Sequence, residues 1–344
     1  MKRLVLTAIS AILLVSCEKE IEFNGEQTDP RLVINSLVEV GQPVSARIGK
    51  SVFFLDSDND MQAPDDLVAS LYVNGSLHGV MDITFDSIAE HCYTVDFEDS
   101  IIYRLEKRFQ SDYRPAVGDV IKITASAHGF EDVEGTTSAL PIAAECQLVD
   151  KTVQELESEY LPIDDEDSIL YVYGRMELFV EVTDPNPGQP DLFRMSIPSD
   201  AYETGAEGQY YTSQYYVSHE YTDPIFGGSI ESNDFIDISD LDVRPEGVFS
   251  DALFDGRSYR IKVPIYFNLH KLKSTDPGFF QVPIKIEHLS KEYYYYLCTC
   301  NQGSALTGFF SEPIQVYSNV TNGYGIVGGC TTSQCLLPLP LDAK

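Results

Sequence analysis

The sequence lacks tryptophan and is poor in basic side chains. Its 344 residues include 23 lysines and arginines against 54 aspartates and glutamates, so the formal net charge is −31 at pH 7. This charge argues against a nucleic-acid partner and against electrostatic adhesion to anionic lipid. The absence of tryptophan weakens a carbohydrate-platform hypothesis, although tyrosine also stacks on sugars. Hydrophobic residues make up 43% of the chain, which supports folded cores and excludes global disorder.

The common catalytic motifs are also absent from the sequence. There is no G-x-S-x-G elbow, no H-E-x-x-H pair and no glycine-rich phosphate loop. The six histidines are scattered singly: His78, His91, His128, His219, His270 and His288. We therefore expect a protein that is not an enzyme, has no catalytic residue and needs no cofactor.

Asp56-x-Asp58-x-Asp60 begins like a calcium-binding loop. The pattern then fails, because Met61 stands where the sharp turn requires glycine and Leu67 stands where the bidentate glutamate is required. We expect a solvated loop here and no metal ligand in the chain, while a calcium site of another kind stays open as an alternative.

The apolar stretch near the N-terminus is too short to cross a bilayer. Residues 4–15 form a run of 12 residues, whereas a spanning helix needs about 20. Because a positive Lys2-Arg3 pair precedes it, the run fits a secretory signal peptide over residues 1–16. The segment "LVSC", which ends at Cys17, resembles the bacterial lipobox, and this resemblance implies lipidation of Cys17. The alternative is an ordinary signal peptide with an incidental cysteine.

Charged residues follow the cysteine directly. Glu18, Glu20 and Glu22 resemble the surface-export signal of Bacteroidota lipoproteins, which implies an outer-membrane protein that faces the cell surface. The alternatives are a merely solvated tether and a place on the periplasmic leaflet. Loss of residues 1–16 would remove two basic side chains and change the formal net charge from −31 to −33. That charge suits a soluble domain held off a negatively charged surface by its tether.

Six further cysteines would lie in an exported chain, where disulfides are permitted. Six cysteines allow 15 connectivities, and their spacing selects none of them. Four lie in the last 50 residues, but Cys298-x-Cys300 and Cys330-x4-Cys335 lack the C-x2-C spacing of common zinc sites. We expect disulfides or inert thiols, with a metal site as the weaker alternative. The six are Cys92, Cys146, Cys298, Cys300, Cys330 and Cys335.

The chain after the leader has the pattern of an all-β protein. Short runs such as "RLVINSLVEV", "LYVYGRMELFVEV" and "SYRIKVPIYFNL" are rich in β-branched and aromatic residues and are bounded by turn residues. The Asn74-Gly75 pair in "YVNGSLHGV" predicts a hairpin. Many short strands with frequent turns favour sandwiches over a parallel sheet. "LSKEYYYYL" fits a strand or a helix, and we expect Tyr293 to Tyr296 to alternate between core and solvent.

These patterns predict two domains behind a tether. We expect a lipidated tether over residues 17–28 and an immunoglobulin-like β-sandwich over residues 29–148. An acidic linker or loop over residues 149–169 would lead to a larger, sandwich-like β domain over residues 170–344. The acidic stretch is either a cation or partner site or a solvated loop.

Tyrosines provide the main candidates for recognition. Six of them lie in a 20-residue segment with two glycines, a composition typical of adaptable contact surfaces. The alternative is that alternate tyrosines pack one face of a sheet. The six are Tyr202, Tyr210, Tyr211, Tyr215, Tyr216 and Tyr221.

Three Asp-Ser-Ile triplets match the short O-glycosylation signal of the same bacteria. We predict modification of at least one of Ser87, Ser100 and Ser168. An intact-mass spectrum from the native host with no hexose-sized increment would contradict this prediction.

Several longer segments resemble one family. "EVTDPNPGQPDLFRMSI", "VFSDALFDGRSYRIKV", "HLSKEYYYYL" and "FFSEPIQVYSNVTNGYGIVGG" occur in that order and, with the lipobox, are similar to Bacteroidota domain-of-unknown-function lipoproteins. Members are commonly encoded beside TonB-dependent, SusC-like receptors. The resemblance implies a two-domain β lipoprotein that assists such a receptor or binds its small ligand. It implies no catalytic residue. A structural or adhesive surface protein is the alternative.

Overall fold

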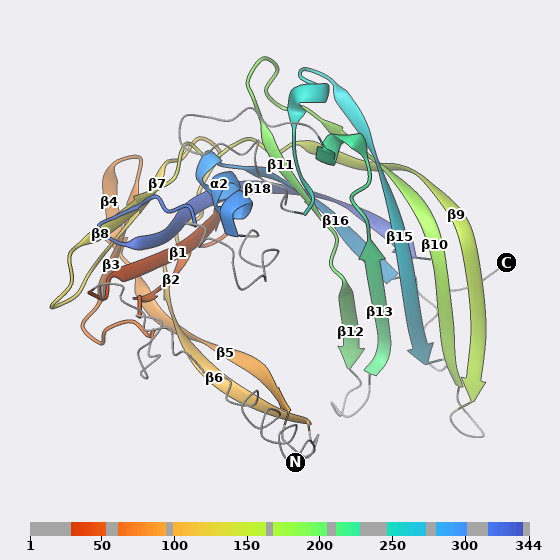
Figure 1. Cartoon of the computed structure of the whole chain (residues 1–344), viewed down its shortest axis with the longest axis horizontal. Helices are drawn as coiled ribbons and strands as arrows, with labels where there is room; N and C mark the ends of the chain where they lie inside the picture. Colours follow the sequence, from red (N-terminus) through yellow and green to blue (C-terminus); the bar gives the residue numbers. More distant parts are fainter. Residues whose placement is uncertain are drawn as a thin grey trace, which may run out of the picture.

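The computed structural model describes residues 29–52, 61–93, 99–162, 168–204, 211–227, 246–272, 280–300 and 316–339. Strands dominate these ranges and form three sheets (Figure 1). The helical segments among the described residues are α2 (Lys291–Cys300) and the short 3-10 turns η1 (Pro224–Gly227) and η3 (Asp251–Leu253). No helix in these ranges is long and apolar enough to cross a membrane. The expectation of an all-β sandwich fold is confirmed.

The three sheets contain eight, five and five strands. In spatial order, the first sheet contains β14 (Val248–Ser250), β11 (Leu192–Ser196), β16 (Phe280–Leu289), β18 (Tyr324–Leu339), β1 (Leu32–Glu39), β2 (Ser45–Lys50), β6 (Asp99–Gln110) and β5 (Asp82–Tyr93). The second contains β12 (Asp200–Thr204), β13 (Tyr211–His219), β15 (Ser258–Leu272), β10 (Ser168–Thr183) and β9 (Glu145–Pro162). The third contains β17 (Val320–Thr321), β8 (Val133–Thr136), β7 (Ile121–Ser126), β3 (Val68–Val73) and β4 (Ser76–Val80).

The predicted hairpin at Asn74-Gly75 is confirmed. Both residues have positive φ angles, of 51° and 81°, and they join β3 to β4. This conformation matches the twist of the flanking strands. The Asn74 side chain also accepts a hydrogen bond from the backbone N–H of Val120 and donates one to Asp119. The turn is therefore fixed to the neighbouring loop.

The large sheet takes part in two separate cores. One core contains Ile34 and Phe109 and lies where β1, β2 and β6 pack against the third sheet. The other contains Phe193, Ile286 and Val263 and lies where β11, β16 and β18 pack against the second sheet. Each core corresponds to one sandwich, and the eight-stranded sheet is common to both.

The last strand connects the two sandwiches. β18 pairs in parallel with β1, the first described strand, and antiparallel with β16 (Figure 1). Val327 packs into the first core, whereas Leu337 packs into the second. Residues near 327 lie within the range expected for the C-terminal domain, yet they complete the N-terminal sandwich. Local patterns could not reveal this, because nearly 300 residues separate the paired strands.

Asn319 fixes the approach to β18. Its side-chain amide donates to the carbonyl oxygens of Thr136 and Val327, and its side-chain oxygen accepts from the backbone N–H of Val327; each distance is 2.9 Å. One side chain thus joins β18 to the end of β8. It lies within "SNVTNGYGIVGG", one of the segments that carry the family resemblance.

Replacing Asn319 with alanine should lower the free energy of unfolding by about 2–3 kcal/mol, because two carbonyls and one N–H lose their partner. Urea unfolding of the purified full chain would measure the change. Asn322→Gly is the control, because glycine tolerates the φ of 60° at this position and the change removes one exposed bond from the Asn322 side chain to the carbonyl oxygen of Asp132. Equal, small losses in both variants would contradict this role for Asn319.

The segment expected as an acidic linker or loop is mostly a strand. β9 covers residues 145–162 and pairs with β10 along its length. The expectation is wrong for these residues, because backbone pairing to β10 holds the segment in place while its glutamates face water. β9 forms an edge of the second sheet, where charged side chains discourage pairing with other chains. Residues 163–167 lie outside the described ranges.

The tyrosine run at 293–296 is helical rather than extended. Ser290 precedes α2, and its hydroxyl oxygen accepts from the backbone N–H groups of Tyr293 and Gly329. Tyr293 and Tyr294 are both buried, so the expected alternation of a strand is wrong. The helix buries neighbouring residues where it packs on β18. The pKa of Tyr293 is raised to about 12, chiefly by burial and also by the nearby Glu287 carboxylate. Tyr293 and Tyr294 therefore have a structural role.

Candidate functional site

Two adjacent tyrosines on β13 have opposite environments. The Tyr215 side chain is 4% exposed and packs in the second core, whereas that of Tyr216 is 55% exposed. Successive side chains of a strand point to opposite faces. The alternative hypothesis, packing on one sheet face, therefore holds for Tyr215, whereas Tyr216 faces solvent and stays a candidate for recognition.

Strand register places Tyr216 in a row of exposed polar side chains. Tyr216 pairs with Asn268 on β15, and Asn268 pairs with Tyr173 on β10. Paired residues share one face of a sheet. Tyr266 lies two residues from Asn268, on the same face, and the side chains of all four residues are exposed.

Arg175, Tyr171 and His270 extend this face. The Arg175 guanidinium lies 5.0 Å from the ring centroid of Tyr266, a cation–π distance. The rings of Tyr171 and His270 are 5.5 Å apart. We call this surface the tyrosine face and define it as Tyr171, Tyr173, Arg175, Tyr216, Tyr266 and His270.

The tyrosine face is partly pre-ordered by internal contacts. The Tyr173 hydroxyl donates a 2.6 Å hydrogen bond to a carboxylate oxygen of Glu157 on β9. This bond is the main cause that raises the pKa of Tyr173 above its ordinary value. Burial lowers the pKa of His270, which favours its neutral form. The face thus combines aromatic rings with hydrogen-bonding tips and one fixed cation, a composition found in recognition surfaces.

The structure assigns different places to the other predicted tyrosines. Tyr221 donates a 2.8 Å hydrogen bond to the carbonyl oxygen of Met195, and burial raises its pKa. It supports the second core. The backbones of Tyr202 and Tyr211 lie on β12 and β13, which pair with each other. Tyr210 lies outside the described residues. Among those of the six whose side chains are described, Tyr216 lies on the tyrosine face.

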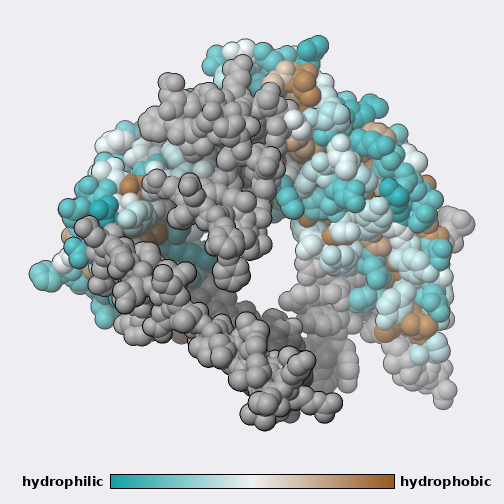
Figure 2. Space-filling view, viewed as in Figure 1, coloured by the Kyte–Doolittle hydropathy of each residue, from teal (hydrophilic) through white to brown (hydrophobic). Residues whose placement is uncertain are grey.

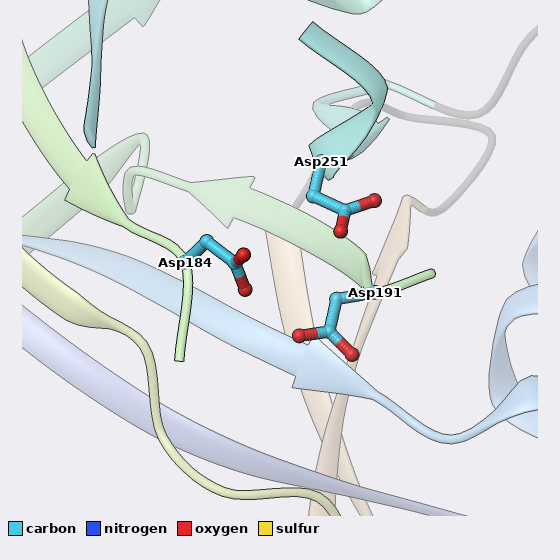
Figure 3. Close-up of side chains that lie close together, drawn as sticks. All are labelled: Asp184, Asp191 and Asp251. Atoms are coloured by element: carbon cyan, nitrogen blue, oxygen red, sulfur yellow. The ribbon is translucent and has the colours of Figure 1, made fainter. Parts of the chain in front are cut away.

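A second candidate is a group of three buried aspartates that the sequence analysis did not identify. Asp184 follows β10, Asp191 precedes β11, and Asp251 begins η3. Their relative exposures are 6%, 5% and 4%. One carboxylate oxygen from each lies within 4.8 Å of the others. Figure 3 shows the three side chains turned toward a shared space.

Backbone hydrogen bonds hold this aspartate cluster, defined as Asp184, Asp191 and Asp251. The two oxygens of Asp184 accept from the N–H groups of Asn186 and Gly256, at 2.8 and 2.5 Å. The N–H of Asp251 donates to the carbonyl oxygen of Asp191 at 3.2 Å. The loops after β10 and around η3 are thus linked through the cluster.

The electrostatics of the aspartate cluster are unfavourable without a compensating charge. The pKa of Asp251 is raised, chiefly by burial and also by the negative charges of Asp191, Asp184 and Asp255. A hydrogen bond from the backbone of Asp191 lowers this pKa in part. Nε2 of buried His288 lies 3.2 Å from Oδ1 of Asp191. Nδ1 of His288 lies 2.6 Å from the carbonyl oxygen of Ile142.

Among the described residues, this is the one group of three or more histidine, cysteine or acidic side chains close enough to share a metal ion. Cys298 and Cys300 stand two residues apart on a helix, so one is buried and the other exposed. They do not form the cysteine metal site that the sequence left open. Burial raises the pKa of Cys330 to about 12, which makes this thiol unreactive.

One pair of cysteines is brought together. Sγ of Cys146 on β9 lies 3.2 Å from Sγ of Cys335 on β18, although 189 residues separate them. Hydrogen bonding to Cys335 is the main cause that raises the pKa of Cys146, and the same bond lowers the pKa of Cys335. For Cys92, only the backbone on β5 is described.

The remaining predicted sites are partly outside the described residues. Cys17 and residues 53–60, which contain the calcium-like loop, are not described. Ser87 is exposed on β5, Ser168 is half-buried on β10, and only the backbone of Ser100 on β6 is described. Glycosylation of these serines stays a prediction.

Comparison with known proteins places the chain in a family. Residues 18–335 match the family described as Domain of unknown function (DUF4249), and the chain therefore belongs to it. The match covers both sandwiches, the tyrosine face and the aspartate cluster. No curated protein and no solved structure matches the chain.

Proposed function

We propose that this protein is a surface-exposed outer-membrane lipoprotein that acts, without catalysis, as an accessory or ligand-binding partner of a TonB-dependent transporter. The observation that carries the proposal is the "LVSC" segment ending at Cys17, followed at once by acidic residues. The family assignment is compatible with this role but defines no function.

Surface properties of the described residues support a solvated domain held by a lipid. Figure 2 shows that the visible described surface is mainly hydrophilic, with apolar side chains in small separate patches. The formal net charge of −31 also supports a solvated domain. Attachment through Cys17 would confine the protein to the membrane plane, which raises its effective concentration near a barrel without any new contact.

The tyrosine face is the contact surface in this proposal. Rigid aromatic rings with polar tips give contact area at a low entropic cost. Tyr216, Tyr173 and Tyr266 lie on three neighbouring strands, so a sheet rather than a loop would present them. Capture and hand-over of a ligand to the barrel is the mechanism that we propose.

Tyr216→Ala should reduce recovery of the partner about tenfold, a typical effect for an exposed aromatic contact. It should change the free energy of unfolding by less than about 0.5 kcal/mol. Tyr215→Ala is the matched comparison, because Tyr215 is a core residue and its truncation should cost about 3 kcal/mol. Co-purification and urea unfolding measure the two effects. Undiminished recovery with Tyr216→Ala would remove the tyrosine face from the proposal.

Protease treatment of intact cells tests the proposed location. Protein on the cell surface should be degraded while a periplasmic marker survives, and metabolic labelling with palmitate should mark the wild-type chain. Complete protection in intact cells, with degradation after the outer membrane is opened, would place the protein on the periplasmic leaflet instead.

A further inference from the structure

We propose that the aspartate cluster binds a divalent, oxygen-preferring cation, for which Ca²⁺ is the test ion. Three carboxylates converge below the surface, each less than one-tenth exposed, with ligand oxygens within 4.8 Å of one another. They come from three segments: the residue after β10, the residue before β11, and the start of η3 (Figure 3). This site is independent of the proposed transport role.

The charges at the cluster are not balanced by the protein. In the described part of the chain, His288 is the single basic side chain within ion-pair distance of any of the three aspartates, and it carries a positive charge only when protonated. It contacts one oxygen of Asp191, and its other ring nitrogen is engaged by Ile142. Neighbouring buried carboxylates repel one another strongly because little water screens them. A divalent cation among them would offset this repulsion.

A separate observation on Asp191 also points to a ligand at the cluster. Its Oδ2 atom is buried and has no hydrogen-bond partner. Asp191 is 5% exposed, and its side chain faces the cluster. Buried polar atoms are nearly always paired in folded proteins. Oδ1 of the same carboxylate contacts His288. Coordination of a cation would satisfy Oδ2.

The donor atoms select the kind of ion. All three side chains offer carboxylate oxygen, the ligand preferred by Ca²⁺ and Mg²⁺ rather than by soft metals. Ca²⁺ accepts about 6–8 oxygens in flexible geometry, so water and loop carbonyls can complete its shell. Two strand ends and the start of a short 3-10 turn supply the three aspartates, which fits this flexibility better than the strict octahedron of Mg²⁺. A bound ion would hold these segments together at the end of the second sandwich.

Calcium titration of the purified full chain in detergent tests the proposal. After treatment with a chelator, native mass spectrometry should detect one Ca²⁺ per chain, and added Ca²⁺ should raise the unfolding temperature by several degrees. Asp191→Asn keeps the shape of the side chain but removes its charge, and it should abolish both effects. Glu159→Gln is the matched control, because it removes an exposed charge on β9 and should leave both effects unchanged.

Two results would overturn the proposal. One is a wild-type chain that takes up no Ca²⁺ and whose unfolding temperature does not respond to it. The other is an equal response in Asp191→Asn, which would mean binding to the acidic surface alone. Asp251→Asn serves as a second variant if Asp191→Asn does not fold, and circular dichroism in chelator identifies which variants are folded.

A different observation carries a second inference: we infer that Cys146 and Cys335 form a disulfide in the exported protein. Their sulfurs are 3.2 Å apart, so a shift of about 1 Å reaches the S–S bond length. The two cysteines lie on strands of different sheets and pack beside the second core. The bond would therefore fasten edge strand β9 to β18.

The oxidation needs an electron acceptor. One thiolate attacks the disulfide of an exported thiol–disulfide oxidoreductase, and the second thiolate then displaces that protein from the mixed disulfide. The two cysteines lose two electrons and two protons, while the oxidoreductase disulfide becomes two thiols. This step requires export, which belongs to the proposed function.

Two measurements test separately whether Cys146 and Cys335 pair and whether the protein is exported. Purified, reduced full chain is equilibrated in a glutathione redox buffer, and peptide mapping should find the 146–335 link before any other. The same mapping on protein from native cells should find the link already formed. Failure in the buffer contradicts the pairing itself. Formation in the buffer with free thiols in cells contradicts export, and with it the proposed function.

Discussion

Gly325→Ala should prevent the protein from folding, or lower its free energy of unfolding by more than about 4 kcal/mol, the range reserved for severe defects. Gly325 has a φ of +105°, which side chains rarely adopt. A Cβ there would overlap the backbone carbonyl of Ile34, its partner on β1. The variant therefore disrupts the parallel β1–β18 pairing, which joins the two sandwiches in one eight-stranded sheet.

Gly79→Ala is the control for this variant. Gly79 lies on β4, and an added Cβ would meet no atom within 4 Å. Its replacement should be neutral or slightly stabilising, because alanine restricts the unfolded chain more than glycine does. Expression level, circular dichroism and urea unfolding would compare the two. A Gly325→Ala chain as stable as Gly79→Ala would contradict the assigned role of the β1–β18 pair.

Cys17→Ala should move the protein from the membrane fraction to the soluble fraction of the native host. A single acyl chain gives only marginal membrane binding, with an association constant of about 10⁴ M⁻¹, so stable attachment needs several chains on the cysteine. In the proposed lipoprotein these chains are attached at Cys17, so the variant would carry none of them. No helix among the described residues offers an alternative membrane span.

Fractionation with immunoblotting measures this shift, and palmitate labelling should disappear in parallel. Cys300→Ala is the matched control, because Cys300 is an exposed thiol on α2, and that variant should stay in the membrane fraction. Membrane attachment of Cys17→Ala equal to that of the wild-type chain would exclude the lipid anchor.

Local sequence patterns predicted the strands well. Alternation in "RLVINSLVEV" corresponds to β1, in which Leu32, Ile34 and Val38 are buried. Asn74-Gly75 predicted its hairpin, because the turn requires positive φ angles at both positions. The β1–β18 pairing could not be predicted, because sequence periodicity describes one strand and not its distant partner. The glycines near residue 325 are the one local sign of the pairing, because a Cβ at Gly323 or Gly325 would collide with the backbone of β1.

The helix α2 was ambiguous for a physical reason. Four consecutive tyrosines have neither a helical nor a strand period, so tertiary contacts decide their structure. Ser290 caps the helix, and the Cα of Gly328 lies beside Tyr293 without a Cβ to obstruct it. Neither contact is visible in the tyrosine run itself.

The candidate sites differ in how far sequence could reveal them. Alternation on β13 predicts that Tyr215 and Tyr216 face opposite ways, and the structure decides which one is exposed. The aspartate cluster could not be found, because Asp251 follows Asp191 by 60 residues and joins it only through folding. Turn residues in "DPNPGQPD" predict a loop there but not its partner. The same distance problem concealed the pairing of Cys146 with Cys335.

A tagged pull-down from detergent-solubilised outer membranes of the native organism, analysed by mass spectrometry, tests the proposed function most directly. The result that we expect is a TonB-dependent barrel recovered in stoichiometric amount with the wild-type chain and in reduced amount with Tyr216→Ala. Recovery of the protein alone from well-extracted membranes would contradict the accessory role, and would favour a free-standing structural or adhesive lipoprotein.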